Sequence, residues 1–156
     1  MQNRPTIAYI AVGANLGDRE ANIRMAIRQL DTLPGTRVLR VSRLLENPAV
    51  GGPSNSPDFL NGVIEIETTL DPHALLHRLL DVEQEMGRQR REKWAPRVID
   101  LDLLLYADQV IAGGDLTIPH PLMHTRRFVL EPLAQIAPDI VHPTAHLTIA
   151  QLLAQL

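Results

Sequence analysis

The sequence predicts an α+β fold whose strands and helices follow one another in the order β-α-β-β-α-β. Apolar runs of strand length alternate with longer stretches that repeat their apolar residues every three or four positions, as amphipathic helices do. A loop, and not a helix, joins the second and third predicted strands, which favours antiparallel pairing. These observations indicate a ferredoxin-like βαββαβ antiparallel sheet with an extra hairpin and C-terminal helices. Helices should cover one face of the sheet and leave the other open for ligands.

The first strand is predicted over residues 6–12, TIAYIAV, an apolar run that ends at Gly13. The first helix is expected from about Asp18, whose side chain suits an N-cap, and should stop before Pro34-Gly35. Its apolar residues recur with helical spacing and should face the core. They are Ile23, Ala26, Ile27, Leu30 and Leu33.

Strands two and three are predicted over residues 36–46 and 59–70, which are rich in aliphatic and β-branched residues. Residues 47–58 between them carry three prolines and two glycines without periodicity, so a long loop is expected there. Alternation places Phe59 and Asn61 on one face of the third strand. An aromatic ring beside a carboxamide suits a flat heterocycle. A core phenylalanine and a turn-forming asparagine would explain the two residues equally well.

The second helix is predicted over residues 71–87, because Asp71-Pro72 is a favourable helix start and Gly87 a favourable end. A strand follows the basic run 88–97, and its side chains should alternate between two faces. Ile99, Leu101, Leu103 and Leu105 are expected on one face, and Val98, Asp100, Asp102 and Leu104 on the other. A short strand, QVIA, is expected to form the extra hairpin. Helices are expected at about 128–136 and 148–155.

Asp100 and Asp102 are the strongest candidate site residues that the pattern alone provides. Two strand rises separate their Cα atoms by roughly 6.5 Å, so their carboxylates can converge on one or two hard cations. The neighbouring cationic side chains, at residues 88–97, suit phosphate groups. Magnesium that carries a polyphosphate would satisfy both sets of charges. The alternative is that the two aspartates face solvent and pair with nearby arginines.

Composition limits the class of ligand. The 156 residues suit one domain, 1–156, and the net charge of −3 argues against a nucleic-acid partner, so the local basic cluster should bind a small molecule. The absence of cysteine is compatible with a reducing compartment, and no signal peptide or spanning segment is recognisable, so we expect no membrane association and a cytoplasmic location. We also expect a monomer.

The run KWAPRVIDLDLL resembles the signature of the 6-hydroxymethyl-7,8-dihydropterin pyrophosphokinases of folate synthesis. Further matching segments occur in order along the chain: GANLGD, NPAVGG, PDFLNG, GRQRREKWAPR and IPHPLMHTRRFVLEPL. The resemblance implies a ferredoxin-like enzyme that transfers pyrophosphate from ATP to the pterin hydroxymethyl group and releases AMP. Pro121 and Leu122 depart from the version of this pattern in which a tyrosine and an aspartate follow the histidine.

The resemblance also implies roles for individual residues. For the metal and the phosphates, two Mg²⁺ ions would be held by Asp100 and Asp102, and the catalytic phosphate contacts would come from Arg88 and Arg97. For ATP as the co-substrate, the contacts implied are those of Arg90, Trp94, His120 and Arg126, of which Arg90 and Trp94 would belong to a closing loop. For the reduced pterin, the residues implied are Asn47, Val50, Phe59, Asn61 and Phe128, with the two phenylalanines sandwiching the ring.

Two rival functions remain open from the sequence. A magnesium-dependent nucleotidyltransferase could use the same pair of aspartates but would release pyrophosphate. A non-catalytic ferredoxin-like ligand-binding module could carry the same charges without consuming ATP. No residue is an obvious general base, so catalysis would depend on in-line positioning and charge neutralisation.

Overall fold

A computed structural model describes residues 4–47, 58–87 and 98–156 of the chain. Ten elements follow one another in it: β1 (Thr6–Ala14), α1 (Arg19–Asp31), β2 (Thr36–Val41), β3 (Leu45–Asn47), β4 (Phe59–Thr68), α2 (Pro72–Gly87), β5 (Asp100–Tyr106), η1 (Met123–Thr125), α3 (Arg127–Ile136) and α4 (Ile149–Ala154). The expected order of strands and helices is therefore confirmed. Among the described residues, none of the helices has the length and hydrophobicity that a membrane-spanning segment requires.

The strands form one antiparallel sheet in the order β2-β4-β1-β5, and β3 adds a short pairing to β4. The two central strands, β1 and β4, are buried over most of their length, as their apolar sequences predict. The outer strand β5 carries the pair of aspartates and pairs with β1 alone among the described strands. This is the ferredoxin-like arrangement expected from the sequence.

The helices begin where their capping residues predict. Asp18 accepts a hydrogen bond from the Ala21 N–H at 3.1 Å, and Asp71 accepts one from the Ala74 N–H at 2.8 Å. Both bonds satisfy amide groups that the first helical turn leaves without partners. The buried residues of α1 are Ile23, Ala26 and Leu30, and those of α2 are Leu75, Leu79, Val82 and Met86.

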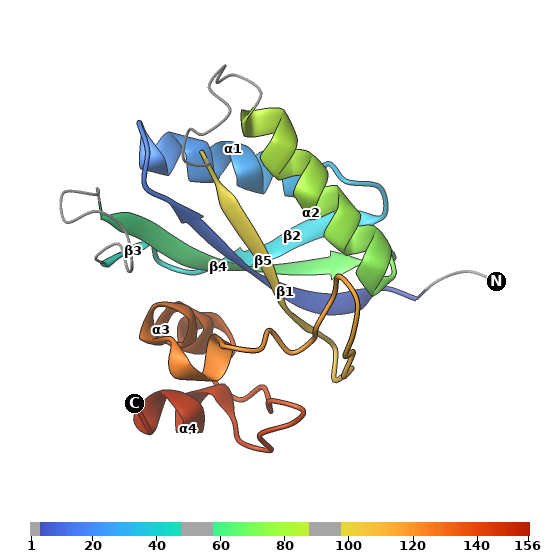
Figure 1. Ribbon diagram of the computed structural model, residues 1–156, viewed down its shortest axis with the longest axis vertical. Helices are drawn as coiled ribbons and strands as arrows, with labels where there is room; N and C mark the ends of the chain where they lie inside the picture. The colour runs from blue at the N-terminus through green and yellow to red at the C-terminus, as the bar shows by residue number, and fades with distance from the viewer. Residues whose placement is uncertain (1–3, 48–57, 88–97) are drawn as a thin grey trace.

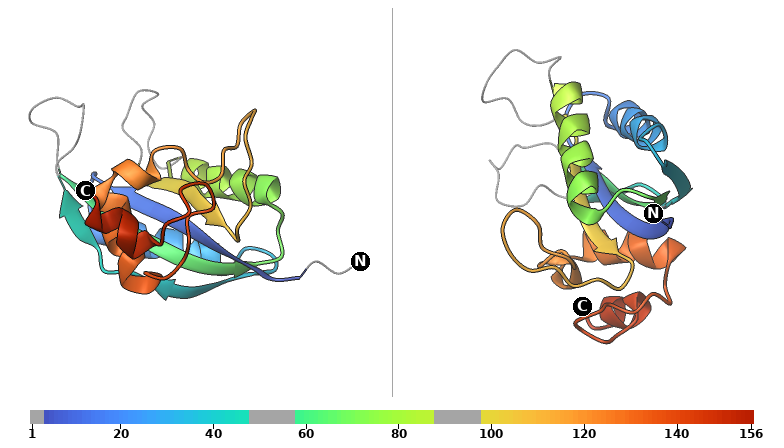
Figure 2. Two further views of the ribbon diagram at one scale, coloured as in Figure 1. Left: turned by 90° about the horizontal axis from the view of Figure 1, so that it is seen from below. Right: turned by 90° about the vertical axis from the view of Figure 1, so that its right-hand side faces the viewer.

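The sheet is covered on both faces, which differs from the expected open face. Figures 1 and 2 show α1 and α2 on one side and α3 and α4 on the other. A first core lies under α1 and α2, and a second lies between the sheet and the two C-terminal helices. Two hydrogen bonds attach α3 to the β2 side of the sheet: Arg40 Nη1 donates to the Ile136 carbonyl at 3.0 Å, and Arg43 N donates to Gln135 Oε1 at 2.9 Å.

The predicted strand 36–46 is divided into β2 and β3 by a break at residues 42–44. Ser42 stays attached to β4, because its N–H donates to the Val63 carbonyl at 2.9 Å and its Oγ accepts from the Val63 N–H at 2.8 Å. A Cβ atom at Gly62 would lie 2.7 Å from Leu44 Cδ2 and 3.2 Å from Ser42 Oγ. The missing side chain of Gly62 thus makes room for the break.

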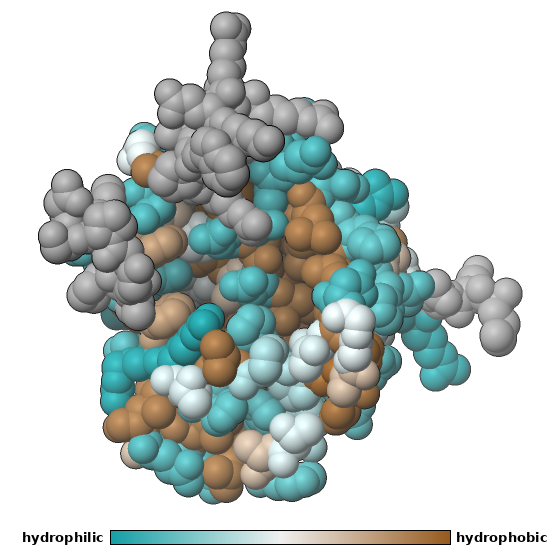
Figure 3. Space-filling view, in the orientation of Figure 1, coloured by the Kyte–Doolittle hydropathy of each residue, from teal (hydrophilic) through white to brown (hydrophobic). Residues whose placement is uncertain are grey.

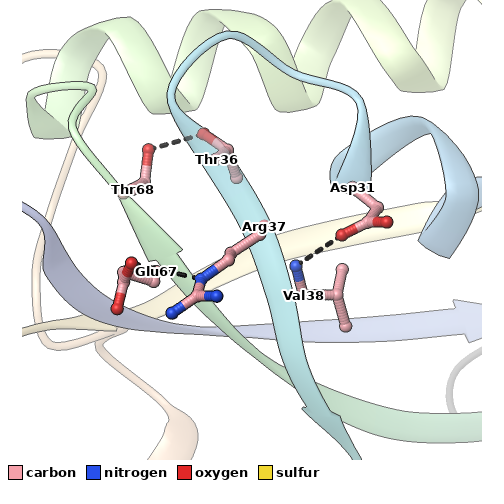
Figure 4. Close-up of polar contacts among 6 residues, drawn as sticks. All are labelled: Asp31, Thr36, Arg37, Val38, Glu67 and Thr68. Atoms are coloured by element: carbon pink, nitrogen blue, oxygen red, sulfur yellow. Dashed lines mark hydrogen bonds and ion pairs between the residues drawn. The ribbon is translucent and has the colours of Figure 1, made fainter.

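Figure 4 shows how the α1–β2 connection is held at the β2 edge. Asp31 Oδ1 accepts from the Val38 N–H at 2.8 Å, and the hydroxyl groups of Thr36 and Thr68 lie 2.7 Å apart. Arg37 Nε donates to Glu67 Oε1 across the same strand pair at 3.2 Å. The Asp31 carboxylate thus occupies the N–H of Val38 at the edge of the sheet, which would otherwise be open to pairing with another strand.

Strand β5 contains an irregularity that alters the predicted facing of its residues. The register shifts between Tyr9 and Ile10, which pair with Leu105 and Leu103, so Leu104 is the extra residue. Leu104 and Leu105 therefore both belong to the second core, although Leu105 was expected on the face of Leu101 and Leu103. The alternation of Asp100 to Leu103 lies before the shift and is unaffected by it.

The predicted hairpin is reduced to one antiparallel bridge between Ile111 and Ile118, and the segment QVIA does not form a strand. The two C-terminal helices agree closely with their predicted ranges, and Thr148 caps α4 in a capping box with Gln151.

Exposed apolar side chains such as Leu80, Val110 and Val141 are distant in sequence. On the face drawn in Figure 3, the coloured residues show separate hydrophobic areas among hydrophilic ones.

His142 makes the stability of the turn before α4 dependent on pH. Its Nδ1 accepts from the Ala145 N–H at 3.0 Å and from the Thr144 N–H at 3.3 Å, so the neutral ring carries its proton on Nε2. Burial, and then the neighbouring His124 and His146, lower the pKa of His142 below its ordinary value of 6.5. Protonation of Nδ1 would remove the acceptor of both bonds.

We therefore expect the free energy of unfolding to fall as the pH decreases through 6.5. In this range the unfolded chain takes up a proton at His142 and the folded chain does not, so acid favours unfolding. Above this range both states are neutral at His142, and its contribution is constant. Urea unfolding at several pH values should show a shallower decrease for His142→Asn than for the wild type. Equal pH slopes would contradict the assignment.

Candidate active site

A cavity of about 400 Å³ lies on the α3 side of the sheet, beside β1, β4 and β5. One part of its lining is aromatic and carboxamide in character, and another part is acidic and basic. Eight of the residues expected from the sequence line it: Asn47, Phe59, Asn61, Asp100, Asp102, His120, Arg126 and Phe128. Residues separated by up to 81 positions in the chain are thus brought to one place by the sheet and the start of α3.

Asp100 and Asp102 line this cavity together, as the two-residue alternation of a strand predicts. Their backbones pair with Gly13 and Ala11 of β1, while the side chain of Leu101 between them is buried in the first core. The two carboxylates therefore belong to a strand that is fixed by an apolar residue on its opposite face. Asp102 is exposed and Asp100 is half-buried. Both can therefore be reached from the cavity.

His120 is brought beside the aspartates by the backbone of β5. Its N–H donates to the Leu104 carbonyl at 3.0 Å, two residues beyond Asp102. The ring Nδ1 accepts from the Leu122 N–H at 3.3 Å, so the neutral ring carries its proton on Nε2. Burial lowers the pKa of His120, Asp102 opposes that effect, and Arg126 adds to it. The charges of Asp102 and Arg126 therefore act on the pKa of this imidazole in opposite directions.

Phe59, Asn61 and Phe128 form the uncharged part of the cavity. The carboxamide oxygen of Asn61 is buried and has no hydrogen-bond partner among the residues that the structure describes. A buried acceptor of this kind needs a donor, and a ligand with an N–H group could supply one. The Arg126 guanidinium carbon lies 5.7 Å from the centre of the Phe128 ring, so the cationic and aromatic parts of the cavity are adjacent.

Gly13 is a site residue that the strand pattern does not identify, because the pattern marks it only as the end of the first strand. A Cβ atom at this position would lie 2.6 Å from Asn61 Nδ2 and 3.7 Å from Phe59 Cδ1. Glycine is therefore required for Asn61 to occupy its place. The signal that could have found it is the segment GANLGD, which the resemblance already included.

Five predicted site residues lie outside the described part of the chain. They are Val50, Arg88, Arg90, Trp94 and Arg97. Their expected roles in holding the phosphates, the nucleotide and the edge of the pterin stay predictions.

A family model described as 7,8-dihydro-6-hydroxymethylpterin-pyrophosphokinase (HPPK) matches residues 9–138. A Synechocystis protein named 2-amino-4-hydroxy-6-hydroxymethyldihydropteridine pyrophosphokinase is 45% identical over 148 residues, which are 95% of this chain and 75% of that protein. A Haemophilus influenzae protein of the same name is 40% identical over 90% of this chain and 87% of its own length. The Schizosaccharomyces pombe folic acid synthesis protein fol1 is 43% identical, and the chain spans only 20% of it.

Solved structures show the same fold. The chain of Plasmodium falciparum HPPK-DHPS crystallised with pteroate superimposes with a TM-score of 0.77 at 17% identity. The match covers 99% of this chain and 43% of the Plasmodium chain. At this identity the likeness concerns the fold, which supports the ferredoxin-like assignment.

The convergence of Asp102, His120 and Arg126 predicts how substitutions change the titration of the imidazole. We expect Asp102→Asn to lower the pKa of His120 further, because a favourable charge is removed from the protonated ring. Arg126→Gln should raise that pKa, because an unfavourable charge is removed. NMR titration of the His120 ring protons in metal-free protein measures both shifts. Shifts of the same sign in the two variants would show that the three side chains do not meet.

Proposed function

Because the chain belongs to the 7,8-dihydro-6-hydroxymethylpterin-pyrophosphokinase family, we infer that it transfers pyrophosphate from ATP to 6-hydroxymethyl-7,8-dihydropterin and releases AMP. This is the step of folate biosynthesis that its relatives are named for, and ATP is its co-substrate. The observation that carries the assignment to this cavity is that it combines two kinds of lining residue: aromatic and carboxamide side chains, and charged ones. The first kind suits a flat heterocycle, and the second suits a metal-bound polyphosphate.

We propose that the pterin lies between Phe59 and Phe128, with its polar edge toward Asn61. The buried Oδ1 of Asn61 would accept from a ring or amino N–H of the pterin. Asn47 also lines the cavity and, with Val50, would complete the recognition of that edge. The aromatic rings provide stacking area and the carboxamide fixes the orientation, which together select a flat, hydrogen-bonding ring.

The acidic part of the cavity fits magnesium by the chemistry of its donors. Asp100 and Asp102 offer hard carboxylate oxygens, and Mg²⁺ is commonly bound by one or two carboxylates together with substrate phosphates. No cluster of three or more potential metal ligands occurs among the described residues, which agrees with a site that the nucleotide completes. We propose two ions. When bound, they would supply charge neutralisation on the phosphate oxygens.

The remaining side chains would position the nucleotide and balance its charge. His120 and Arg126 line the cavity beside the aspartates, and Arg88, Arg90, Trp94 and Arg97 are assigned from the motif. The pterin hydroxyl oxygen attacks the β-phosphorus in line, and the bond between that phosphorus and the oxygen of the α-phosphate breaks. AMP leaves with the electron pair, and the hydroxyl proton passes to solvent. Positioning provides most of the rate enhancement.

The rival assignments lose their support once the family is known. A nucleotidyltransferase would release pyrophosphate, and a ligand-binding module would not consume ATP, whereas the relatives are named as pyrophosphokinases. We further propose that residues 1–156 act as one domain, because a chain of this length suits a single core, and that the protein is a monomer. A cytoplasmic location stays our expectation, because ATP and magnesium are available there.

Asp102→Ala should lower turnover about a hundredfold or more. Without this carboxylate the site would hold Mg²⁺ poorly, and the negative charge of the phosphates in the transition state would not be neutralised. Asp102 is an exposed residue of β5, so the fold should persist and circular dichroism should be unchanged. Chromatography of the nucleotide product measures the rate and should show AMP in the wild type. Near-normal AMP release from the variant in excess magnesium would refute the metal assignment.

Gly13→Ala should weaken pterin binding about tenfold to a hundredfold, because the added methyl group displaces Asn61. The KM for ATP should change little, because Asn61 lies in the uncharged part of the cavity. Gly87→Ala is the matched control, since a Cβ atom there meets no atom of the described residues within 4 Å. Equal effects on the KM values of both substrates would count against the division of the cavity.

A further inference from the structure

Glu83 of α2 makes a contact with β5 that the proposed function does not yet use. Its Oε2 accepts a hydrogen bond from the backbone N–H of Leu101 at 2.8 Å. Leu101 is the one residue between Asp100 and Asp102, and the bond is made by the peptide N–H that joins it to Asp100. A side chain from a helix thus holds an edge strand at its functional position.

The direction of this bond shows how β5 is held. Leu101 pairs with Val12 of β1, and its N–H points away from β1 because it donates to Glu83. In an antiparallel ladder, hydrogen-bonded and non-hydrogen-bonded pairs alternate. The neighbouring pairs, Asp100 with Gly13 and Asp102 with Ala11, are therefore the ones that bond to β1. Asp100 and Asp102 are thus held by β1 on one side of the strand, and Leu101 is held by Glu83 on the other.

Glu83 itself has a fixed position. It is half-buried, and it lies between Val82 and Met86 of α2, which are each only 4% exposed and belong to the first core. The helix packs against the face of β5 that carries Leu101, whereas the aspartates line the cavity on the other face. The hydrogen bond to the Leu101 N–H therefore links Glu83 to the site through the backbone of β5.

We propose that Glu83 is a positioning residue that sets the spacing and orientation of the Asp100 and Asp102 carboxylates for divalent cations. The inference rests on the proposed function, because it concerns the metal ligands of that same site. An edge strand with an unoccupied amide can twist or fray, and a change in backbone direction at Leu101 turns both neighbouring side chains. The Glu83 bond opposes this change. Residues that orient metal ligands commonly affect metal affinity strongly.

The test compares Glu83→Met, which removes the acceptor, with Glu83→Gln, which keeps a side-chain oxygen. Methionine favours helices and fills irregular space, so the variant should retain the packing of α2. Asp81→Ala, an exposed carboxylate of the same helix, is the control for loss of charge. Thermal unfolding of all variants checks that they fold.

Two readouts do not depend on activity. In metal-free protein, NMR hydrogen exchange at the Leu101 amide should be faster in Glu83→Met and unchanged in Glu83→Gln and Asp81→Ala. The EPR signal of free Mn²⁺, titrated with a non-hydrolysable ATP analogue present, should show about tenfold weaker binding to Glu83→Met only. In the assay, the magnesium concentration for half-maximal activity should rise about tenfold, with little loss of kcat at saturation.

Each alternative outcome overturns the inference in a distinguishable way. A purely structural role would lower kcat at every magnesium concentration and leave the half-saturating concentration unchanged. Loss of affinity in Glu83→Gln as well would assign the effect to charge and not to the hydrogen bond. If Asp102→Ala binds Mn²⁺ as tightly as the wild type, the metal site of the proposed function fails. If Asp102→Ala loses binding while Glu83→Met retains it, only the role of Glu83 fails.

Discussion

The alternation of side chains along β5 is the constraint on which the rest of the site depends. One face of this strand must be apolar, because Leu101 and Leu103 pack into the core under α1 and α2. The opposite face carries Asp100 and Asp102 into the cavity. A shift of one residue would bury two carboxylates and expose two leucines, at a cost in both desolvation and lost apolar burial. The core therefore fixes the direction of the acids.

This constraint acts over a short distance, and the irregularity at Leu104 marks its limit. Before it, side chains alternate between the first core and the cavity; after it, Leu105 enters the second core and Tyr106 the first. The extra residue leaves the Leu104 carbonyl as the acceptor for the His120 N–H. The irregularity thus places the imidazole beside Asp102 without any change in the acid-bearing part of the strand. Bulges near sites commonly redirect side chains in this way.

The sequence predicted the elements that depend on local patterns and missed those that depend on distant contacts. Helix starts at Asp18 and Asp71, and the pairing of faces at Phe59 and Asn61, follow from capping and alternation. The break at Ser42 depends on Val63 and Gly62, which are about twenty residues away, and no local signal marks it. Gly13 and Glu83 were missed for the same reason: their importance comes from Asn61 and Leu101, which meet them only in the folded chain.

The covered second face explains why there is a cavity at all. A sheet with one open face would offer its ligand a flat surface on which Phe59 and Asn61 lie side by side with the acids. Arg40 and Arg43 attach the end of α3 to the β2 side of the sheet, and the first turn of this helix contributes Phe128 to the lining of the cavity. Phe128 thus lines the same cavity as Phe59, Asn61 and the two aspartates. A cavity lined from both the sheet and α3 can enclose more of a ligand than an open sheet face could.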